Sequence, residues 1–506
     1  MIRLTRWQLL RSLLAVLLIV ISWAGIAAAQ TGLTIRFFER ETVPLLYIAP
    51  KQAQAAPGVL VAHGFSGSKQ LMLGYGYVLA RAGYAVMLWD FDGHGANPNP
   101  LGRFDGNALQ KNLQVALRSL TEQPGVDASR LALLGHSMGG SAVLSAGVND
   151  VDRFAATIAV SSAGGGITPQ APRSLQLQVG AWEGRLIPYA ERSLAQAGGA
   201  NSQFNQGKAR ELIVVPSVEH ITILFNGASH QAALKWLDAA FDRQSTSHYV
   251  DRRMIWYFLH LVGWLLALSV IAPKFAASTS TNSQITDSQI KVPIAKVPIA
   301  KVPIARSAIG LIGSAIAAVG GLLLLNPLVQ LQSLGGVQVG GAVGVWFLIA
   351  GLVWLVVLGR FPRPSVRTVG LGLAVFALLW IAFGLMAQFV WLQWWLILPR
   401  LKVWLPIAIA CFPWFLASGI VQQDISTRSR FLWWFGQSLI LIGGFILVIS
   451  VVPKLGFMFL LLPLFPVLIG LLSFVEALLN EAWIYAIASA LLFAWLLAAG
   501  FPLSAA

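Results

Sequence analysis

The stretch LALLGHSMGG, residues 131–140, joins a short apolar run to a serine flanked by glycines. The run 131–134 predicts a buried strand, and the apolar residues 141–148 predict a helix. Ser137 would then occupy the tip of a tight strand–turn–helix, in the pattern Gly-x-Ser-x-Gly, where small residues let strand and helix approach closely. The helix N-terminus would direct free N–H groups toward this point. The stretch therefore predicts a nucleophilic serine.

The sequence on both sides of this motif alternates between strand-like and helix-like segments. Amphipathic stretches at 107–121 and 231–241 read as helices. This alternation predicts an α/β domain over residues 31–250, with a mostly parallel sheet covered by helices and with its chemistry at the carboxyl ends of the strands. The other apolar, β-rich runs are 45–48, 58–62, 85–89, 155–160, 175–179 and 211–215.

A serine nucleophile needs a base that accepts its proton. His220 follows the predicted strand 211–215 and would stand at the carboxyl edge of the sheet, on the side of Ser137. His230 is the alternative, but it opens the final predicted helix and lies farther from the strand end. We therefore expect His220 to be the base.

The base in turn needs a carboxylate that fixes its tautomer. Glu183 is the carboxylate that follows the predicted strand 175–179. Asp150 and Asp152 are alternatives, but they precede a strand and would lie at the opposite edge of the sheet. We expect Glu183 to be the acid of a Ser–Glu–His triad.

Acyl transfer also requires hydrogen-bond donors for the developing oxyanion. The backbone N–H of Met138, directly after the serine, is one candidate. The loop 63–69 follows the predicted strand 58–62 and offers the N–H of Phe65 as the second. A plain glycine-rich turn is the alternative reading of that loop.

Taken together, four short segments resemble the α/β-hydrolase superfamily in order and spacing, in particular its esterase, lipase and dienelactone-hydrolase-like members. The resemblance covers about residues 33–241 and implies the α/β-hydrolase fold, with no cofactor and no metal. Two departures stand out: glutamate replaces the commoner aspartate as acid, and serine stands where dienelactone hydrolases carry cysteine. In the superfamily the segment equivalent to Asp90, Asp92 and His94 is structural. The segments are 63–65 (HGF), 90–95 (DFDGHG), 135–139 (GHSMG) and 218–220 (VEH).

The rest of the chain has a different composition. The whole chain is 57% hydrophobic and 11% charged, whereas a soluble protein carries about 25% charged residues. Residues 1–30 contain Arg3, Arg6 and Arg11 before an apolar run, which indicates either a cleaved signal peptide or an uncleaved membrane anchor. Segment 254–273 and about seven segments within 307–500 predict transmembrane helices. Those seven are 307–326, 341–359, 369–391, 403–421, 431–452, 455–475 and 482–500.

The net charge of +15 comes mostly from the flanks of these segments, because residues 31–250 hold 17 Lys or Arg against 15 Asp or Glu. A nucleic-acid-binding role is therefore not indicated. With the N-terminus in the cytoplasm, thirteen Lys or Arg fall on the inner side and five on the outer. The outer five are Arg252, Arg253, Arg400, Lys402 and Lys454. We expect a bacterial plasma membrane, and the charge bias predicts that residues 31–250 lie on its extracytoplasmic side. Arg252 and Arg253 oppose this orientation.

The basic, low-complexity loop 274–306 contains KVPIA three times, at 291–305. A proline every five residues prevents a regular helix. The loop is expected to be a flexible linker on the inner side, with electrostatic attachment to anionic lipid as the alternative. The lone Cys411 allows no intramolecular disulfide.

Three functions fit these features. The first is a membrane-bound serine hydrolase that cleaves carboxylic esters, lipid or acyl esters among them, through an acyl-enzyme. The second is a peptidase or amidase with the same triad. The third is a membrane transport or assembly protein whose hydrolase-like domain only binds. About 15 residues separate the strands near 160 and 175, too few for a large cap, which favours an open site and amphiphilic esters.

Overall fold

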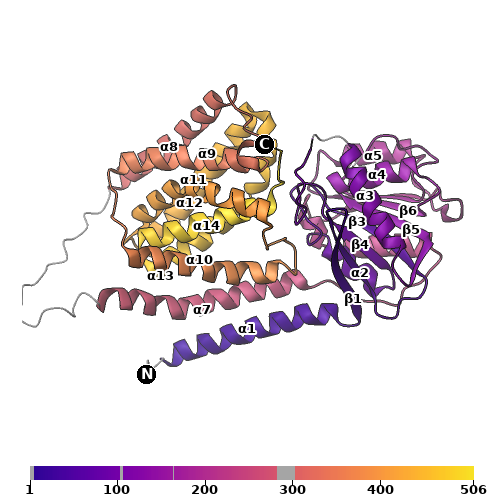
Figure 1. Ribbon diagram of the computed structural model, residues 1–506, viewed down its shortest axis with the longest axis horizontal. Helices are drawn as coiled ribbons and strands as arrows, with labels where there is room; N and C mark the ends of the chain where they lie inside the picture. The colour runs from indigo at the N-terminus through magenta and orange to yellow at the C-terminus, as the bar shows by residue number, and fades with distance from the viewer. Residues whose placement is uncertain (1–4, 103–105, 163, 282–302, 506) are drawn as a thin grey trace, which may run out of the picture.

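The computed structural model describes residues 5–102, 106–162, 164–281 and 303–505. It has two bodies, a sheet domain and a bundle of apolar helices, joined along one end of the bundle (Figure 1). The helix α1 (Arg6–Gln30) runs beside the bundle and leads directly into the sheet. The chain then returns to the bundle through α7 (Arg253–Thr281).

Eight strands form one sheet in the order β1-β2-β4-β3-β5-β6-β7-β8. Strands β1 and β2 are antiparallel to their neighbours, and all other pairs are parallel. The mostly parallel sheet is therefore confirmed. The strands are β1 (Leu33–Arg40), β2 (Val43–Pro50), β3 (Ala56–Ala62), β4 (Ala85–Trp89), β5 (Val126–His136), β6 (Ala156–Val160), β7 (Leu175–Gly180) and β8 (Arg210–Val215).

The edge strand β1 is the one strand that our sequence analysis omitted. Its residues LTIRFFER carry three charges and are mostly half-exposed, because only one neighbour covers an edge strand. Central strands read differently, since both of their faces are buried and their sequences are continuous apolar runs. All seven residues of β3 are buried.

Helices cover both faces of the sheet. Along β3, Val59 and Val61 point into the core beneath α2 and α6, while Leu60 and Ala62 point into the core beneath α3 and α4, as the two-residue period of a strand requires. A smaller cluster packs α5 against β7. These helices are α2 (Leu73–Arg81), α3 (Gly106–Thr121), α4 (Met138–Asn149), α5 (Ile187–Gln196) and α6 (Gly227–Ala240).

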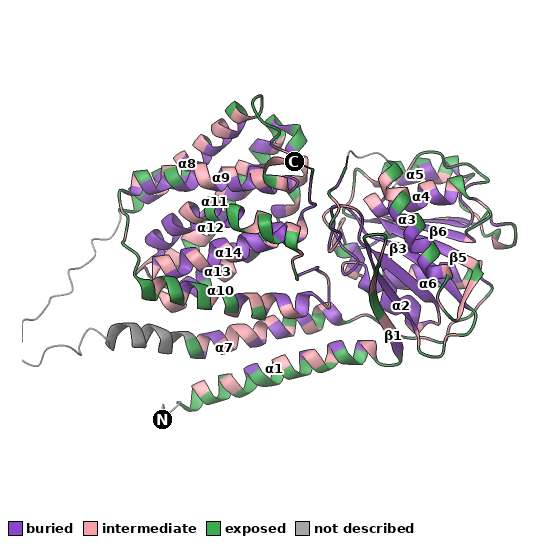
Figure 2. Ribbon diagram, viewed as in Figure 1, coloured by how far each residue is buried: buried purple, intermediate pink, exposed green. Residues whose placement is uncertain are grey.

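The described residues contain eight helices that are long and apolar enough to cross a membrane. They are compatible with a multi-pass membrane protein. Figure 2 shows many exposed positions along these helices, and large apolar residues are among them. Besides α1 and α7 they are α8 (Ile304–Leu325), α9 (Gly340–Leu358), α10 (Val366–Ala387), α11 (Leu398–Gln422), α12 (Thr427–Val451) and α14 (Ala482–Gly500).

The expected span 455–475 is not one straight helix in the structure. This region is a 3₁₀ segment, η4 (Pro453–Leu461), followed by α13 (Leu464–Leu479), with a bend of 48° between them. Pro463 lies at the break, where a proline cannot donate the next helical hydrogen bond. The broken pair still joins the two ends of the bundle, because Phe457 contacts the sheet domain and Glu476 pairs with Arg430 at the opposite end.

The linker between α7 and α8 is shorter than expected. The helix α7 continues to Thr281 and α8 begins at Ile304, so the helices take up both ends of the expected loop 274–306. Most of the KVPIA segment, residues 291–302, lies outside the described residues.

Two of the five basic residues assigned to the outer side are buried at the junction of the two bodies. Arg253 is 2% exposed and pairs with Asp251 at 2.7 Å. Arg400 is 1% exposed. Neither is an exposed loop charge in the folded protein, as our sequence analysis assumed.

Candidate active site

The turn that carries Ser137 is strained as the motif predicted. Ser137 connects β5 to α4 with φ 52° and ψ −117°, a region that non-glycine residues rarely adopt. The flanking glycines are sterically required. A Cβ at Gly135 would lie 2.2 Å from the carbonyl oxygen of Gly139, and a Cβ at Gly139 would lie 2.5 Å from that of His63.

The structure brings the three expected side chains together from three strand ends. Nε2 of His220 lies 2.9 Å from Oγ of Ser137, and Nδ1 of His220 lies 2.6 Å from Oε1 of Glu183. Ser137 follows β5, Glu183 follows β7 and His220 follows β8. This geometry lets the imidazole accept the serine proton at Nε2 while Nδ1–H donates to the carboxylate.

Glu183 is held in the ionised form by its neighbours. Burial by itself would raise the pKa of this carboxyl group, but hydrogen bonds from His220, Ser161 and the Gly180 N–H outweigh it and keep the pKa below the ordinary value. Oε2 accepts from Ser161 Oγ at 2.6 Å and from the Gly180 N–H at 2.7 Å. A carboxylate fixed by three donors can orient His220 and stabilise its imidazolium.

The turn around His220 is braced on both sides. Nε2–H of His136 donates to the His220 carbonyl oxygen at 2.8 Å. The Glu219 carboxylate accepts from the N–H groups of Ile221 and Thr222, each at 2.8 Å. Burial lowers the pKa of His136 to about 3, so this ring is neutral near pH 7. These contacts fix the backbone from which the base projects.

The glycine-rich loop after β3 passes next to the nucleophile. A Cβ at Gly64 would lie 3.0 Å from Cβ of Ser137 and 2.7 Å from Nδ1 of His136, so only glycine allows this approach. Phe65 follows directly. Met138 is the first residue of α4, where N–H groups have no helical partner. Both expected oxyanion donors therefore belong to backbone that adjoins Ser137.

The rejected candidates lie elsewhere. His230 is buried beneath α2, where its Nε2–H donates to the Leu224 carbonyl oxygen at 2.8 Å. Asp150 and Asp152 follow the C-terminus of α4 and precede β6, at the opposite edge of the sheet from Ser137. None of the three contacts Ser137 or Glu183 in the described part of the chain.

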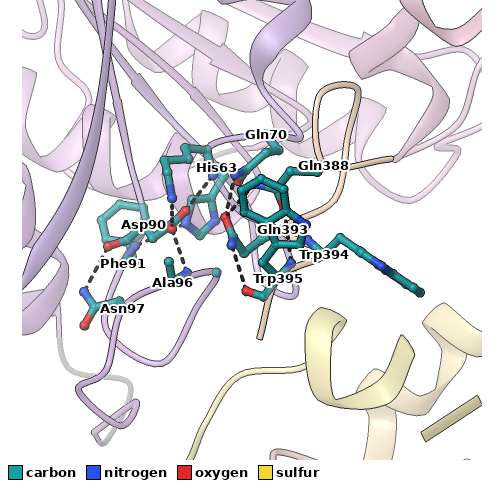
Figure 3. Close-up of polar contacts among 12 residues, drawn as sticks. His63, Gln70, Asp90, Phe91, Ala96, Asn97, Gln388, Gln393, Trp394 and Trp395 are labelled. Atoms are coloured by element: carbon teal, nitrogen blue, oxygen red, sulfur yellow. Dashed lines mark hydrogen bonds and ion pairs between the residues drawn. The ribbon is translucent and has the colours of Figure 1, made fainter. Parts of the chain in front are cut away.

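The Asp90 segment forms a hydrogen-bonded loop. The Asp90 carboxylate accepts from the N–H groups of Lys69 and Ala96 and pairs with the Lys69 ammonium group (Figure 3). His94 donates from Nδ1 to the Asp92 carbonyl oxygen at 2.9 Å. The described residues contain no group of three or more His, Cys, Asp or Glu that could hold a metal ion.

Sequence reasoning missed Ser161, Glu219 and His136 as supports of the site. Ser161 could have been found, because it comes directly after β6 and so lies at the same sheet edge as the three expected side chains. The supporting roles of Glu219 and His136 depend on backbone atoms in a neighbouring turn, for which their spacing in the chain gives no signal.

Comparisons with known proteins bear on the fold of this part of the chain. A family model described as serine aminopeptidase, S33, matches residues 53–212, which include Ser137 and Glu183. This part of the chain is an α/β-hydrolase domain. The expected fold class is confirmed: an α/β-hydrolase domain is followed by a helical region with many apolar helices.

The curated relatives that match are distant. An uncharacterized protein of Mycobacterium tuberculosis is 31% identical over 93 residues, 18% of this chain and 32% of that protein. An uncharacterized 31.7 kDa protein of Escherichia coli, from the traX-finO intergenic region, is 26% identical over 111 residues, 22% of this chain and 39% of that protein. The chain thus spans about a third of the length of the curated relatives it matches.

Solved structures are similar to part of the chain. A dienelactone hydrolase from Anabaena variabilis is 20% identical, with 44% of this chain and 100% of that chain covered and a TM-score of 0.33. Esterase Est22 is 16% identical, with 43% and 85% covered and a TM-score of 0.33.

Proposed function

We propose that this chain is a membrane-bound serine hydrolase that cleaves carboxylic esters through an acyl-enzyme on Ser137. The observation that carries the proposal is the pair of hydrogen bonds that links Ser137, His220 and Glu183. Oγ of Ser137 lies 2.9 Å from Nε2 of His220, and Nδ1 of His220 lies 2.6 Å from Oε1 of Glu183. Its setting adds support, because these side chains follow β5, β8 and β7 at one edge of the sheet.

The proposed reaction has two halves. Nε2 of His220 takes the proton of Ser137 as Oγ attacks the ester carbonyl carbon, and the oxyanion accepts hydrogen bonds from the N–H groups of Met138 and Phe65. Collapse of this intermediate breaks the ester C–O bond, and His220 gives its proton to the leaving alcohol. Water, deprotonated by His220, then attacks the acyl-enzyme, and Ser137 regains its proton as the acid departs.

An amidase or peptidase is the second candidate, because the matching family model is described as a serine aminopeptidase. An amide requires the same groups but a better-placed proton donor for the leaving nitrogen. We favour esters because the link between β6 and β7 spans only residues 161–174, and because the His220 side chain is 30% exposed. An open site beside a membrane suits amphiphilic esters.

The proposed arrangement places the hydrolase domain, residues 31–250, outside the cytoplasm, with residues 254–273 and 307–500 in the membrane. We propose that residues 1–30 are a retained anchor rather than a cleaved signal peptide. Two contacts support this choice: Arg81 donates to the carbonyl oxygens of Ala28 and Ala29, at 2.8 and 3.1 Å, and α1 lies along α7, where a Cβ at Gly263 would be 3.0 Å from the Ala15 carbonyl oxygen.

One panel of substrates tests the reaction class. Full-length protein in detergent would be assayed with p-nitrophenyl esters of increasing chain length and with matched peptide p-nitroanilides. We expect hydrolysis of the esters and much slower cleavage of the anilides, both abolished in Ser137→Ala. Faster anilide cleavage would favour the peptidase. Activity that persists in Ser137→Ala would refute the assigned site.

A further inference from the structure

The loop that carries Phe65 is held by the helical bundle. The Phe65 ring stacks on the ring of Phe457 in η4, with centroids 3.8 Å apart and planes inclined by 22°. The side chain of Phe65 packs against the hydrophobic core of the bundle. The next residue, Ser66, donates from Oγ to the carbonyl oxygen of Gly500, the last residue of α14, at 2.8 Å.

The far end of the same loop has a second attachment. Gln70, which is 1% exposed, donates from Nε2 to Oε1 of Gln393 at 2.5 Å. Gln393 lies between α10 and α11, and Figure 3 shows its side chain and that of Gln70 directed toward each other across the junction. Gln388 braces this segment by accepting from the Trp394 N–H at 2.7 Å. The two ends of the Phe65 loop therefore rest on different parts of the bundle.

Arg400 ties the neighbouring hydrolase loop to the bundle. Its guanidinium group donates to the carbonyl oxygens of Gly93 and Gly95, at 2.7 and 2.8 Å, and to those of Ala498 and Phe501, at 2.5 and 2.8 Å. One buried side chain thus joins two carbonyls of the hydrolase domain to two at the end of the bundle. Lysine cannot reproduce this contact, because its ammonium group is a single point and lacks the planar fork.

The loop held by Arg400 supports the Phe65 loop. The ring of His94, between the two bonded glycines, packs edge-to-face with the Phe65 ring, with centroids 5.7 Å apart. The Asp90 carboxylate accepts from the Lys69 N–H at 2.7 Å. Gly64, next to Phe65, touches the nucleophile turn. A displacement of the bundle at Phe457 or Arg400 would therefore move the backbone that adjoins Ser137.

We propose that Phe457 and Arg400 are positioning residues, through which the helical bundle aims the Phe65 N–H at the oxyanion. This inference rests on the proposed esterase function. The Phe65 loop contains Gly64 and Gly67, and glycines leave backbone freedom that an external contact has to remove. The bundle is then part of the enzyme's working site as well as its anchor.

The first test compares two phenylalanines of η4 in the full-length protein. Phe457→Ala removes the ring under Phe65, whereas Phe459→Ala is the matched control, since Phe459 is 45% exposed in the same segment. The kcat and KM for p-nitrophenyl butyrate would be measured per active site, with sites counted by fluorophosphonate titration. Counting sites separates misplacement of the oxyanion donor from loss of folded protein.

Loss of one oxyanion donor costs about 10²–10³ in kcat, so a displaced donor should cost roughly 10- to 100-fold. We expect this loss in Phe457→Ala, with KM changed less than about 3-fold because the contact acts mainly in the transition state. Phe457→Leu should recover part of the rate by refilling the space. Phe459→Ala should match the parent.

The second test replaces Arg400 with lysine, with Lys402→Gln on the exposed side of α11 as its control. We expect Arg400→Lys to lower kcat per site in the same way and Lys402→Gln to leave it unchanged. If Phe457→Ala yields no folded protein, Arg400→Lys and Phe457→Leu decide the matter. Parental kcat per site in the folded Phe457 and Arg400 variants would overturn the inference. A parent protein that neither hydrolyses esters nor labels at Ser137 would instead refute the proposed function.

Discussion

Nδ1 of His220 lies 2.6 Å from Oε1 of Glu183, and the other oxygen of the same carboxylate accepts from Ser161. Every donor around Glu183 therefore favours the ionised acid. Glu183→Gln should keep the shape of the loop but lower kcat by on the order of 10³–10⁴, because an amide favours the wrong tautomer of His220. Glu183→Asp should be milder. Ester hydrolysis by these variants, with Glu191→Gln on the surface of α5 as control, checks this. Full activity in Glu183→Gln would redirect the search for the acid.

The same carboxylate predicts how stability depends on pH. Its pKa in the folded protein lies below the ordinary value of 4.5, because its hydrogen bonds outweigh its burial. A depressed pKa stabilises the fold fully above the unfolded value, and the effect is lost as pH falls through the folded value. The difference in melting temperature between the parent and Glu183→Gln should therefore stay constant near neutrality and shrink below about pH 4.5. A difference that grows on acidification would contradict the assignment.

The two histidine candidates should separate by phenotype. His220→Ala should lose activity almost as completely as loss of the nucleophile, since triad members act as a unit, and should lower the melting temperature less than His230→Ala does, because the His220 side chain is 30% exposed. His230 is buried and donates to the Leu224 carbonyl oxygen. Its ring packs edge-to-face with that of Tyr75, with ring centroids 4.6 Å apart. His230→Ala should therefore cost about 2–4 kcal/mol of stability and keep its rate per active site. Melting curves and site-normalised kinetics distinguish the two. The reverse pattern would make His230 the base.

Engineered cysteines can show on which side of the membrane the hydrolase domain lies. Ser202 is exposed on the hydrolase domain, and Thr427 is exposed where α12 begins, at the opposite end of the bundle. In cells carrying Cys411→Ser, a membrane-impermeant thiol reagent should label Ser202→Cys. It should reach Thr427→Cys only after permeabilisation. Labelling of Thr427→Cys alone in intact cells would invert the orientation and place the substrates in the cytoplasm.

The fate of the N-terminus follows from the contacts of α1. If Arg81 and α7 hold a retained helix, the intact mass of the purified protein should include residues 1–30. Removal of the donor in Arg81→Ala should weaken the attachment, because two carbonyl oxygens lose their partner. A mature protein that begins near Thr31 would show that the segment is a cleaved signal peptide.

Much of the fold could be predicted because β3 to β7 are buried on both faces and therefore contain continuous apolar runs. The order of strand ends also pointed to Ser137, Glu183 and His220, since parallel strands bring their carboxyl ends to one edge. The edge strand β1 was missed because its charged, half-exposed residues produce no such run.

The junction between the two bodies could not be predicted. The sequence predicts Arg400 to be a loop charge beside a membrane span. In the structure it is buried and donates hydrogen bonds to four backbone carbonyl oxygens. Every residue has a backbone carbonyl, so the sequence does not show which carbonyls accept a hydrogen bond. The Gly93 carbonyl also lies 307 positions before its donor, Arg400. The break between η4 and α13 did have a signal in Pro463, within a stretch whose overall apolar character favoured one continuous span.

Covalent labelling of Ser137 by a fluorophosphonate tests the central claim most directly. The full-length protein in detergent should take up one equivalent of probe, and peptide mapping should place the adduct on Ser137. Ser137→Ala should not label, whereas Ser141→Ala, which removes an exposed serine one turn further along α4, should label as the parent does. Loss of labelling in Ser137→Ala alone is the result that we predict. A parent that stays unlabelled, or an adduct that persists in Ser137→Ala, would contradict the account.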